Sequence, residues 1–164
     1  MRFLCSALMS LLIAGCASFD GHTLVPGTST LSEVTSLMGE PALALKRPDG
    51  NTWLYFTRYP FGRATFVAAI DPNGILRGID QRLAYRHIHA VKAGMREEEV
   101  RVLLGPPRAV SRLPRQQRNV WEYPWRHAAK ELRMLWVQFS DDGIVREVVE
   151  MHDYEADPEN GPLP

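Results

Sequence analysis

Few side chains in this sequence have the type and spacing that chemistry requires. Its five histidines are scattered, and the one close pair, His87 and His89, has no cysteine or carboxylate at the spacing of a metal site. The chain also lacks the His-Glu-x-x-His, Gly-x-Ser-x-Gly and P-loop motifs of metalloproteases, serine hydrolases and nucleotide-binding enzymes. A helix start at the surface explains the histidine pair better than a metal does. We therefore predict a protein that is not an enzyme, with no catalytic residues, metal site or cofactor.

Two acidic clusters are better explained by local structure than by ion binding. The segment 141–143, Asp-Asp-Gly, lacks the alternating ligands of a calcium loop and has the composition of a hairpin turn. The three glutamates at 97–99 could form a metal or substrate site. The first turn of a helix also favours acids, because they interact well with the helix dipole, and we prefer this interpretation.

Cys16 is the residue with the most specific predicted modification. It follows a positive start at Arg2, an apolar run over residues 3–13 and the small residues Ala14 and Gly15. The segment Leu-Ile-Ala-Gly-Cys resembles the lipobox of bacterial lipoproteins, in which the cysteine thiol is lipidated and becomes the first mature residue. We expect residues 1–15 to be a lipoprotein signal peptide and Cys16 to carry the lipid. The alternative is an ordinary secretory signal in which Cys16 has no such role.

The neighbours of Cys16 predict where the lipid holds the protein. The other cysteine, Cys5, lies in the signal peptide, so the mature chain would contain no disulfide. The second mature residue would be Ala17, whereas an aspartate there retains lipoproteins in the inner membrane of many Gram-negative bacteria. We predict an anchor on Cys16 in the outer membrane, on its periplasmic side. Residues 16–24 would be the lipid-anchored tether.

The composition is that of a folded protein without a general affinity for nucleic acid. Hydrophobic residues make up 45% of the chain and charged residues 23%, which is ordinary for a packed domain. The 19 Lys and Arg residues are balanced by 19 Asp and Glu residues, which argues against a nucleic-acid partner. Residues 153–164 are acidic and rich in proline, and we expect a flexible tail there.

The rest of the chain contains one pattern twice, over residues 25–83 and 84–152. Matching segments occur in the same order, at 27–41 and 94–107, at Trp53-x-Tyr55 and Trp121-x-Tyr123, and at 70–75 and 139–144. Duplicated segments in one order indicate duplicated structure. We therefore expect the repeated tryptophans to occupy equivalent places in the two copies and to belong to the core.

Each copy predicts a helix followed by antiparallel strands. Val34, Leu37 and Met38 share one helical face, and Thr30 and Glu33 have the spacing of a capping box. Turn residues at 48–50 and 72–74 separate the strands of two hairpins, and the second copy adds a short helix around 86–91. We predict an α+β fold of two tandem repeats, each of one or two helices plus antiparallel strands. The repeats would form one continuous curved antiparallel sheet with the helices on one face.

The second copy also carries a family resemblance. The residues that carry it are Gly94, Met95, Val100, Leu103, Leu104, Gly105, Pro107, Trp121, Tyr123, Phe139, Gly143 and Val145. They resemble the SmpA/OmlA family, also called BamE-like, and the tandem arrangement is similar to the beta-lactamase-inhibitor-protein fold. The first copy departs from the motif by an extra residue before Val34 and by the lack of Met after Gly27.

The resemblance implies binding rather than catalysis. SmpA/OmlA proteins are outer-membrane lipoproteins, some of which assist the insertion of β-barrel proteins, and inhibitor-like members bind proteins through the concave face of the sheet. A single-copy assembly factor would lack half of this chain, so membership of the barrel-assembly complex does not follow from the resemblance. Such motifs support a fold more strongly than a function.

Non-repeated aromatic side chains are the first candidates for contact with a partner. The strand predicted over 132–139 is apolar on both faces, so both faces need cover. Helices can cover one face, and either a partner or the curvature and loops of the sheet can cover the other. Trp and Tyr are favoured at interfaces, and we select Trp125 and Trp136 as contact residues.

A basic segment supplies the second group of candidates. No acid interrupts the four arginines of residues 108–118, which are Arg108, Arg112, Arg115 and Arg118, whereas residues 146–159 are strongly acidic. A basic hairpin near a membrane could contact lipid head groups or an acidic partner. A solvated turn is the simpler explanation of the same residues.

These observations predict a non-enzymatic lipoprotein of the cell envelope. We expect it to act at the outer membrane as a protein-binding or scaffolding module for an unidentified envelope protein, with envelope or outer-membrane protein assembly as one such role. The alternative is a periplasmic inhibitor-like protein, or one that binds an amphiphile or small ligand on the concave face of the sheet. A preformed pocket lined by Trp and Tyr would favour a ligand, and a broad shallow patch would favour a protein.

Overall fold

The computed structural model describes residues 20–127 and 131–153. The predicted signal peptide, Cys16 and the predicted tail after Asp153 lie outside the described residues, as does the first part of the tether. Within the part that is described, no helix is long and apolar enough to cross a membrane.

The first half of the described chain, residues 20–83, places one helix on a four-stranded antiparallel sheet. Helix α1 spans Leu31–Met38, and the sheet has the strand order β1-β2-β3-β4. The strands are β1 (Leu43–Lys46), β2 (Thr52–Thr57), β3 (Thr65–Ile70) and β4 (Leu76–Gln81). The predicted capping box is confirmed, because the Glu33 backbone N–H donates to Thr30 Oγ1 and the Thr30 N–H donates to Glu33 Oε2, at 3.3 and 2.7 Å.

The second half, residues 84–153, has the same order of elements with one extra helix. Helices α2 (Tyr85–Ile88) and α3 (Glu97–Leu104) come before a sheet with the strand order β5-β6-β7-β8. The elements after α3 are β5 (Ala109–Leu113), the 3-10 turn η1 (Pro114–Gln116), β6 (Arg118–Arg126), β7 (Leu132–Phe139) and β8 (Val145–His152). The three glutamates at 97–99 form the first turn of α3, as the sequence predicts.

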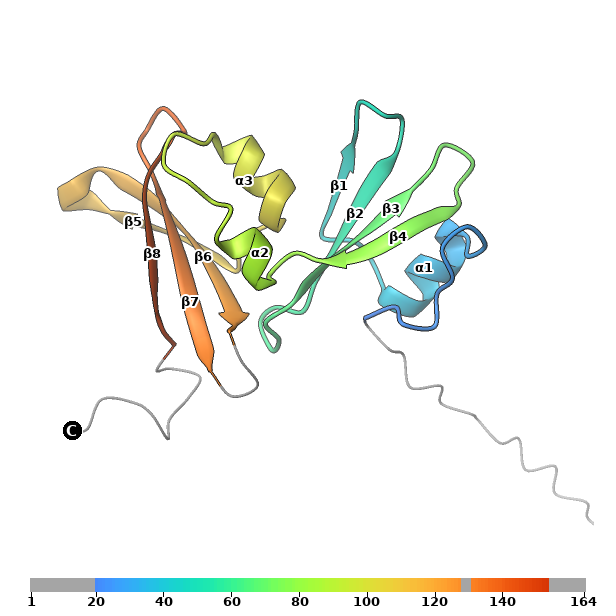
Figure 1. Cartoon of the computed structure of the whole chain (residues 1–164). Helices are drawn as coiled ribbons and strands as arrows, with labels where there is room; N and C mark the ends of the chain where they lie inside the picture. Colours follow the sequence, from blue (N-terminus) through green and yellow to red (C-terminus); the bar gives the residue numbers. More distant parts are fainter. Residues whose placement is uncertain (1–19, 128–130, 154–164) are drawn as a thin grey trace, which may run out of the picture.

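The predicted single continuous sheet with all helices on one face is wrong. The structure is mostly β and contains two separate four-stranded antiparallel sheets with a few short helices. The prediction assumed that the two repeats join edge to edge. The link between β4 and β5 instead carries α2 and α3, and Figure 1 shows these helices between the two sheets, so the edges of the sheets do not pair.

Helix α3 is the element that both sheets share. Its Val100 and Leu104 belong to the core of the second sheet, together with buried residues of β6, β7 and β8. On its other side, the Tyr55 hydroxyl of β2 donates a hydrogen bond of 2.7 Å to the Val102 carbonyl. Helix α1 packs on the opposite face of the first sheet, against Leu54 and Phe56. The layers therefore run α1, first sheet, α3, second sheet (Figure 1).

The Trp-x-Tyr segments do not occupy equivalent places in the two halves. The pairing of β3 with β4 is irregular just before Ile70, and the pairing of β7 with β8 is irregular just before Phe139. When the two sheets are aligned at these positions, Leu54 is equivalent to Trp121. A shift of one residue turns a strand side chain to the other face of its sheet. Trp53 consequently faces away from α1 and toward α3, whereas Trp121 faces α3 from the opposite sheet.

Candidate binding groove beside helix α3

Two tyrosines attach the sheets to the backbone of α3 and its C-terminal end. Tyr55 donates to Val102 O, and Tyr123 donates to Gly105 O at 3.1 Å. Burial raises the pKa of Tyr55 to about 12, against the opposing effect of the nearby Arg82 and Arg47, and burial also raises the pKa of Tyr123. Both phenols therefore stay protonated and remain donors at neutral pH.

Trp53 lies two residues before Tyr55 on the same face of β2, and two arginines lie against its ring. The guanidinium carbons of Arg47 and Arg82 are 4.7 and 4.6 Å from the ring centroid, within the range of a cation–π interaction. Arg47 follows β1 and Arg82 follows β4, the two edge strands of the first sheet. The stack thus assembles residues that are far apart in the sequence on one face of this sheet.

A groove of about 380 Å³ separates this stack from α3. It is lined by Arg47, Trp53, Arg82, Met95, Glu98, Glu99, Val102 and Leu103. The first sheet contributes the two cations and the indole ring, and the segment of α3 contributes aliphatic side chains and two carboxylates. We refer to these eight residues as the groove. It can hold a group that presents apolar and charged atoms side by side.

Arg82 is the most deeply placed charge of the groove. The residue is 8% exposed, its backbone N–H donates to Thr65 O at 2.7 Å, and burial lowers the pKa of its guanidinium. The guanidinium forms an ion pair of 3.2 Å with Asp80, which also pairs with Arg86 and with His87. Its Nε atom has no hydrogen-bond partner among the described residues.

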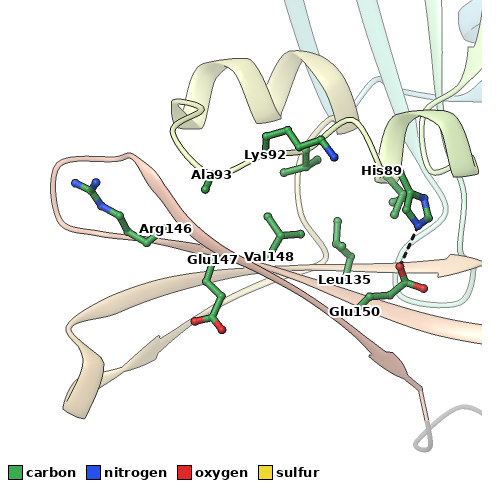
Figure 2. Close-up of a pocket in the computed structure, with 10 residues that line it drawn as sticks. His89, Lys92, Ala93, Leu135, Arg146, Glu147, Val148 and Glu150 are labelled. Atoms are coloured by element: carbon green, nitrogen blue, oxygen red, sulfur yellow. Dashed lines mark ion pairs between the residues drawn. The ribbon is translucent and has the colours of Figure 1, made fainter.

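A second hollow, of about 510 Å³, lies over the inner face of the second sheet (Figure 2). Its walls come from the segment between α2 and α3 and from β7 and β8. Leu135 and Val148 form its apolar part, while His89, Lys92 and Glu150 are among its charged residues. Its charges of both signs include an ion pair of 3.4 Å between His89 and Glu150.

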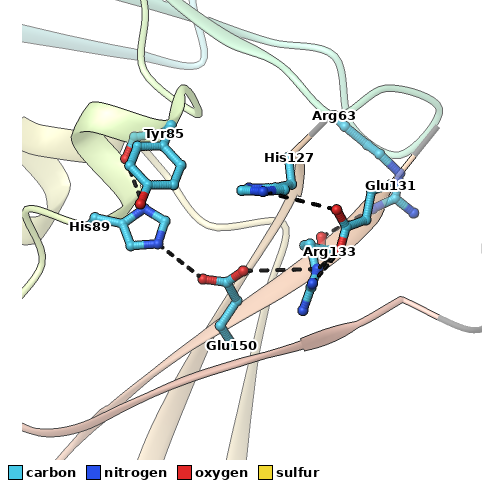
Figure 3. A network of polar contacts seen from close by, with 7 residues as sticks. All are labelled: Arg63, Tyr85, His89, His127, Glu131, Arg133 and Glu150. Carbon is cyan, nitrogen blue, oxygen red and sulfur yellow. Dashed lines mark hydrogen bonds and ion pairs between the residues drawn. The ribbon is translucent and has the colours of Figure 1, made fainter. Parts of the chain in front are cut away.

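His89 and Glu150 of this second hollow belong to a network of polar contacts (Figure 3). Arg133 pairs with Glu131 and lies 3.9 Å from Glu150, which in turn contacts His89. The ring of Tyr85 stacks on that of His89 at 3.8 Å between centroids. These contacts satisfy the charges within the cluster, so it offers fewer free groups to a ligand than the groove does.

The two tryptophans selected from the sequence lie in different places. Trp125 is 0% exposed and belongs to the core of the second half, with its ring 5.8 Å from that of His89 and 5.4 Å from that of His127. It is therefore core rather than contact surface. Trp136 is half-buried on the sheet face away from α3, where it lines a hollow of about 240 Å³ together with Arg108.

Three of the four selected arginines form ion pairs within the second half of the chain. Arg108 pairs with Glu122 at 3.0 Å, Arg112 with Asp141 at 2.8 Å and Arg118 with Glu147 at 3.0 Å. Arg115 is exposed in the turn η1. The sheet therefore pairs the basic segment with acids of the second half, and only part of its charge is directed at solvent.

The histidine pair does not converge on a metal site within residues 20–127 and 131–153, where no three ligands of the His, Cys, Asp and Glu types come together. His87 instead lies 2.9 Å from Asp80, and His89 stacks on Tyr85. Burial lowers the pKa of His87, and the contact with Asp80 opposes this shift. The protonated form of His87 is therefore disfavoured despite its carboxylate neighbour.

Sequence reasoning missed the arginines of the groove. Arg47 and Arg82 are 35 positions apart in the sequence, and no local motif joins them to Trp53. One available signal was positional, since Arg47 ends one predicted strand and Arg82 follows shortly after the end of another in the same copy. The missing information was the strand order, which places β1 and β4 at opposite edges of a narrow sheet whose face meets α3.

Comparison with known proteins leaves the family of this chain open. No protein-family model and no curated protein matches the chain. A DUF4309 family protein (YjgB) from Bacillus subtilis shares 15% identity, with 80% of this chain and 84% of that chain covered and a TM-score of 0.32. A candidate beta-lactamase inhibitor protein from Streptococcus mutans shares 13% identity, with 75% and 82% covered and a TM-score of 0.29. Likenesses at these TM-scores carry no argument about function, and neither neighbour is an SmpA/OmlA protein by its description.

Proposed function

We propose that this protein is a non-enzymatic, lipid-anchored binding protein of the cell envelope that holds a segment of a partner protein in the groove. The observation that carries the proposal is the groove itself, where Trp53 and its two arginines face α3 across an open space. Both halves of the molecule contribute walls. The site therefore exists only when the first sheet is packed on α3.

The chemistry of the walls suits a polypeptide. Trp and Arg are enriched among the residues that dominate the energetics of protein interfaces. Met95, Val102 and Leu103 offer an apolar surface, and Glu98 and Glu99 place negative charge opposite Arg47 and Arg82. A protein segment can match apolar and oppositely charged groups at once, because its side chains alternate in character along the backbone.

The lipid anchor and the outer-membrane location complete the proposal from the sequence. The lipobox-like segment at Cys16 and the residue Ala17 support a protein held at the periplasmic side of the outer membrane. In that setting a protein-binding groove fits a scaffolding role in the envelope. Assembly of outer-membrane proteins is one process in which such a scaffold could act.

Site-specific photo-crosslinking in intact cells tests this function. A photo-reactive phenylalanine analogue would replace Leu103 in the groove or, as a control, Leu31, an exposed residue of α1 on the far side of the first sheet. We expect Leu103 to give an adduct with one envelope protein and Leu31 to give none. Equal adducts at both positions, or none at Leu103, would contradict the proposal.

A second candidate function is the binding of a small amphiphile. The groove volume of about 380 Å³ lies in the range of small-molecule sites, and its Trp53 ring and apolar wall favour a hydrocarbon group. Mass spectrometry of the intact lipoprotein, released gently from membranes, would detect such a ligand as a fixed added mass. The amphiphile hypothesis requires that this mass disappear in a Trp53→Ala variant.

A further inference from the structure

Arg82 combines deep burial with an incomplete set of hydrogen bonds. Its side chain is 9% exposed, and its Nε has no partner among the described residues. A guanidinium has five N–H donors, and a buried charged donor left unpaired costs free energy. Arg82 lines the groove, so an acceptor that enters the groove lies next to this guanidinium, although its Nε atom is itself buried.

The positive charge around Arg82 exceeds the charge that neutralises it. Asp80 is the carboxylate that pairs with Arg82, and it also pairs with Arg86 and contacts His87. Arg47 adds a further cation over the same indole ring, and within the described residues it has no ion pair. One carboxylate thus serves several cations, and the two arginines of the groove leave it electropositive at this end.

The surroundings strengthen the attraction for an anion. Trp53 covers one side of both guanidinium groups, and Val102 and Leu103 form an apolar wall nearby. Electrostatic interactions are stronger where side chains exclude water. The field of both cations also reaches Tyr55, where it opposes the effect of burial on the pKa.

We infer that Arg82 and Arg47 form an oxyanion subsite of the groove, which takes the carboxylate of an aspartate or glutamate side chain of the partner segment. Planar guanidinium groups match a carboxylate in a two-pronged geometry. This inference rests on the proposed function, since it names the chemistry of the segment that the groove would hold.

The opposite wall sets a limit on the charge of the ligand. Glu98 and Glu99 line the same groove and repel additional negative charge. A polyanion, or a doubly charged phosphate, would bring its second charge toward these carboxylates. A single acidic side chain next to an aliphatic or aromatic residue matches the subsite, the apolar wall and the acidic wall together.

Nuclear magnetic resonance of the full lipoprotein in detergent micelles tests the subsite. The probes are an acetylated, amidated peptide Gly-Val-Glu-Val-Gly and its counterpart with Gln in place of Glu, with octanoate and inorganic phosphate as separate arms. The readouts are the Nε–H signal of Arg82 and the indole N–H signal of Trp53. We expect the Glu peptide to move the Arg82 signal downfield in a saturable manner, with a Kd of about 1 mM, and the Gln peptide to leave it in place.

Variants separate the subsite from general charge. Arg47→Gln should weaken binding of the Glu peptide about tenfold, which corresponds to about 1.4 kcal/mol. Arg77→Gln is the matched control, because Arg77 is exposed on β4, lies 3.8 Å from Asp71 and does not line the groove, and it should change nothing. Arg82→Lys should remove the Nε–H signal and weaken the movement of the Trp53 signal.

The outcomes decide between the sources of the anion. Equal shifts with the Glu and Gln peptides, or no shift at about 10 mM peptide, would overturn the subsite. Tighter binding of phosphate would overturn the carboxylate assignment, and tighter binding of octanoate would replace the protein segment by an amphiphile. Binding of the Glu peptide without an in-cell adduct at Leu103 would preserve the subsite and remove the proposed function.

Discussion

At the scale of single residues, the hydroxyls of Tyr55 and Tyr123 and the ring of Trp53 form the contacts and the groove between the sheets and α3. Tyr55 and Tyr123 each give one hydroxyl proton to a backbone carbonyl in or just after the helix. Trp53 does not enter a core, and its ring instead carries two guanidinium groups at the groove. Alternate positions of one strand thus divide between a structural hydrogen bond and the lining of the groove.

The buried tyrosines predict how stability depends on alkaline pH. Burial raises the pKa values of Tyr55 and Tyr59 to about 12 and also raises that of Tyr123. Above about pH 10 the unfolded phenols ionise while the folded ones stay protonated, so the stability present below pH 10 should be lost progressively toward pH 12. Absorbance titration should show three tyrosines that ionise late, and Tyr55→Phe should remove one of them and cost about 1 kcal/mol. Ionisation of all tyrosines near pH 10 would contradict the buried contacts.

The two tryptophans at the Trp-x-Tyr segments should respond differently to truncation. Trp121 is 5% exposed and belongs to the core, so Trp121→Ala should cost about 3–5 kcal/mol of the free energy of unfolding. Trp53 is half-buried at the groove, so Trp53→Ala should cost only about 1 kcal/mol. Thermal melts of both variants measure the difference. Equal losses would show that Trp53 is a core residue after all.

At the scale of elements, α3 serves as the shared layer between two sheets. Its first turn is acidic and its end at Gly105 fits against the first sheet, where an added Cβ would lie 2.8 Å from Tyr55 and 2.9 Å from Thr65. Glycine is therefore favoured at this position for two reasons, the positive φ of 83° and the close approach of the first sheet. The groove depends on this approach, because the facing wall belongs to the first sheet.

A matched pair of glycines measures the contact between the halves. Gly39 ends α1 with a similar φ of 86°, but an added Cβ there meets nothing within 4 Å. Gly39→Ala and Gly105→Ala share the cost of a positive-φ, extended backbone that is essentially restricted to glycine, about 1–3 kcal/mol, and Gly105→Ala should lose about 1–3 kcal/mol more through steric overlap. Chemical denaturation of both variants gives the two values. Identical losses would mean that the first sheet does not rest on α3.

The local elements could be predicted from the sequence because their signals are local. The capping box at Thr30 and Glu33 and the acidic first turn of α3 follow from residues close in the chain. The pairing of sheet edges has no such signal, and the prediction that the two repeats join edge to edge was wrong although the helices between them were predicted. The two copies were aligned on Trp53 and Trp121 because these residues are identical. The register shifts before Ile70 and Phe139 show that this alignment is one residue out of register.

At the scale of the whole molecule, the first sheet and helix α3 of the second half form a groove that neither half has alone. Side chains from strand ends 35 residues apart meet residues of a helix from the other half. The basic and acidic segments, which looked like separate surfaces in the sequence, pair with each other across the second sheet at Arg118 and Glu147. Part of the charge of these two segments is therefore neutralised within the second half.

The location of the molecule is tested through its predicted lipid. Cys16→Ala should leave an unprocessed precursor that takes up no labelled fatty acid, because the predicted lipid is attached to the thiol of Cys16. The parent protein should take up the label and fractionate with the outer membrane. A parent protein without label would refute the lipid anchor, and fractionation with the inner membrane would refute the predicted location alone.

The most direct test of the central claim compares two tryptophans in the cross-linking experiment. The yield of the in-cell adduct at Leu103 would be measured in the parent, in Trp53→Ala and in Trp136→Ala, whose side chain lies on the outer face of the second sheet. If the groove binds the partner, Trp53→Ala should lower the yield about tenfold, the loss expected for a contact residue worth more than 1 kcal/mol, and Trp136→Ala should leave it unchanged. A yield that survives Trp53→Ala and collapses in Trp136→Ala would move the binding surface to the outer face and contradict the account.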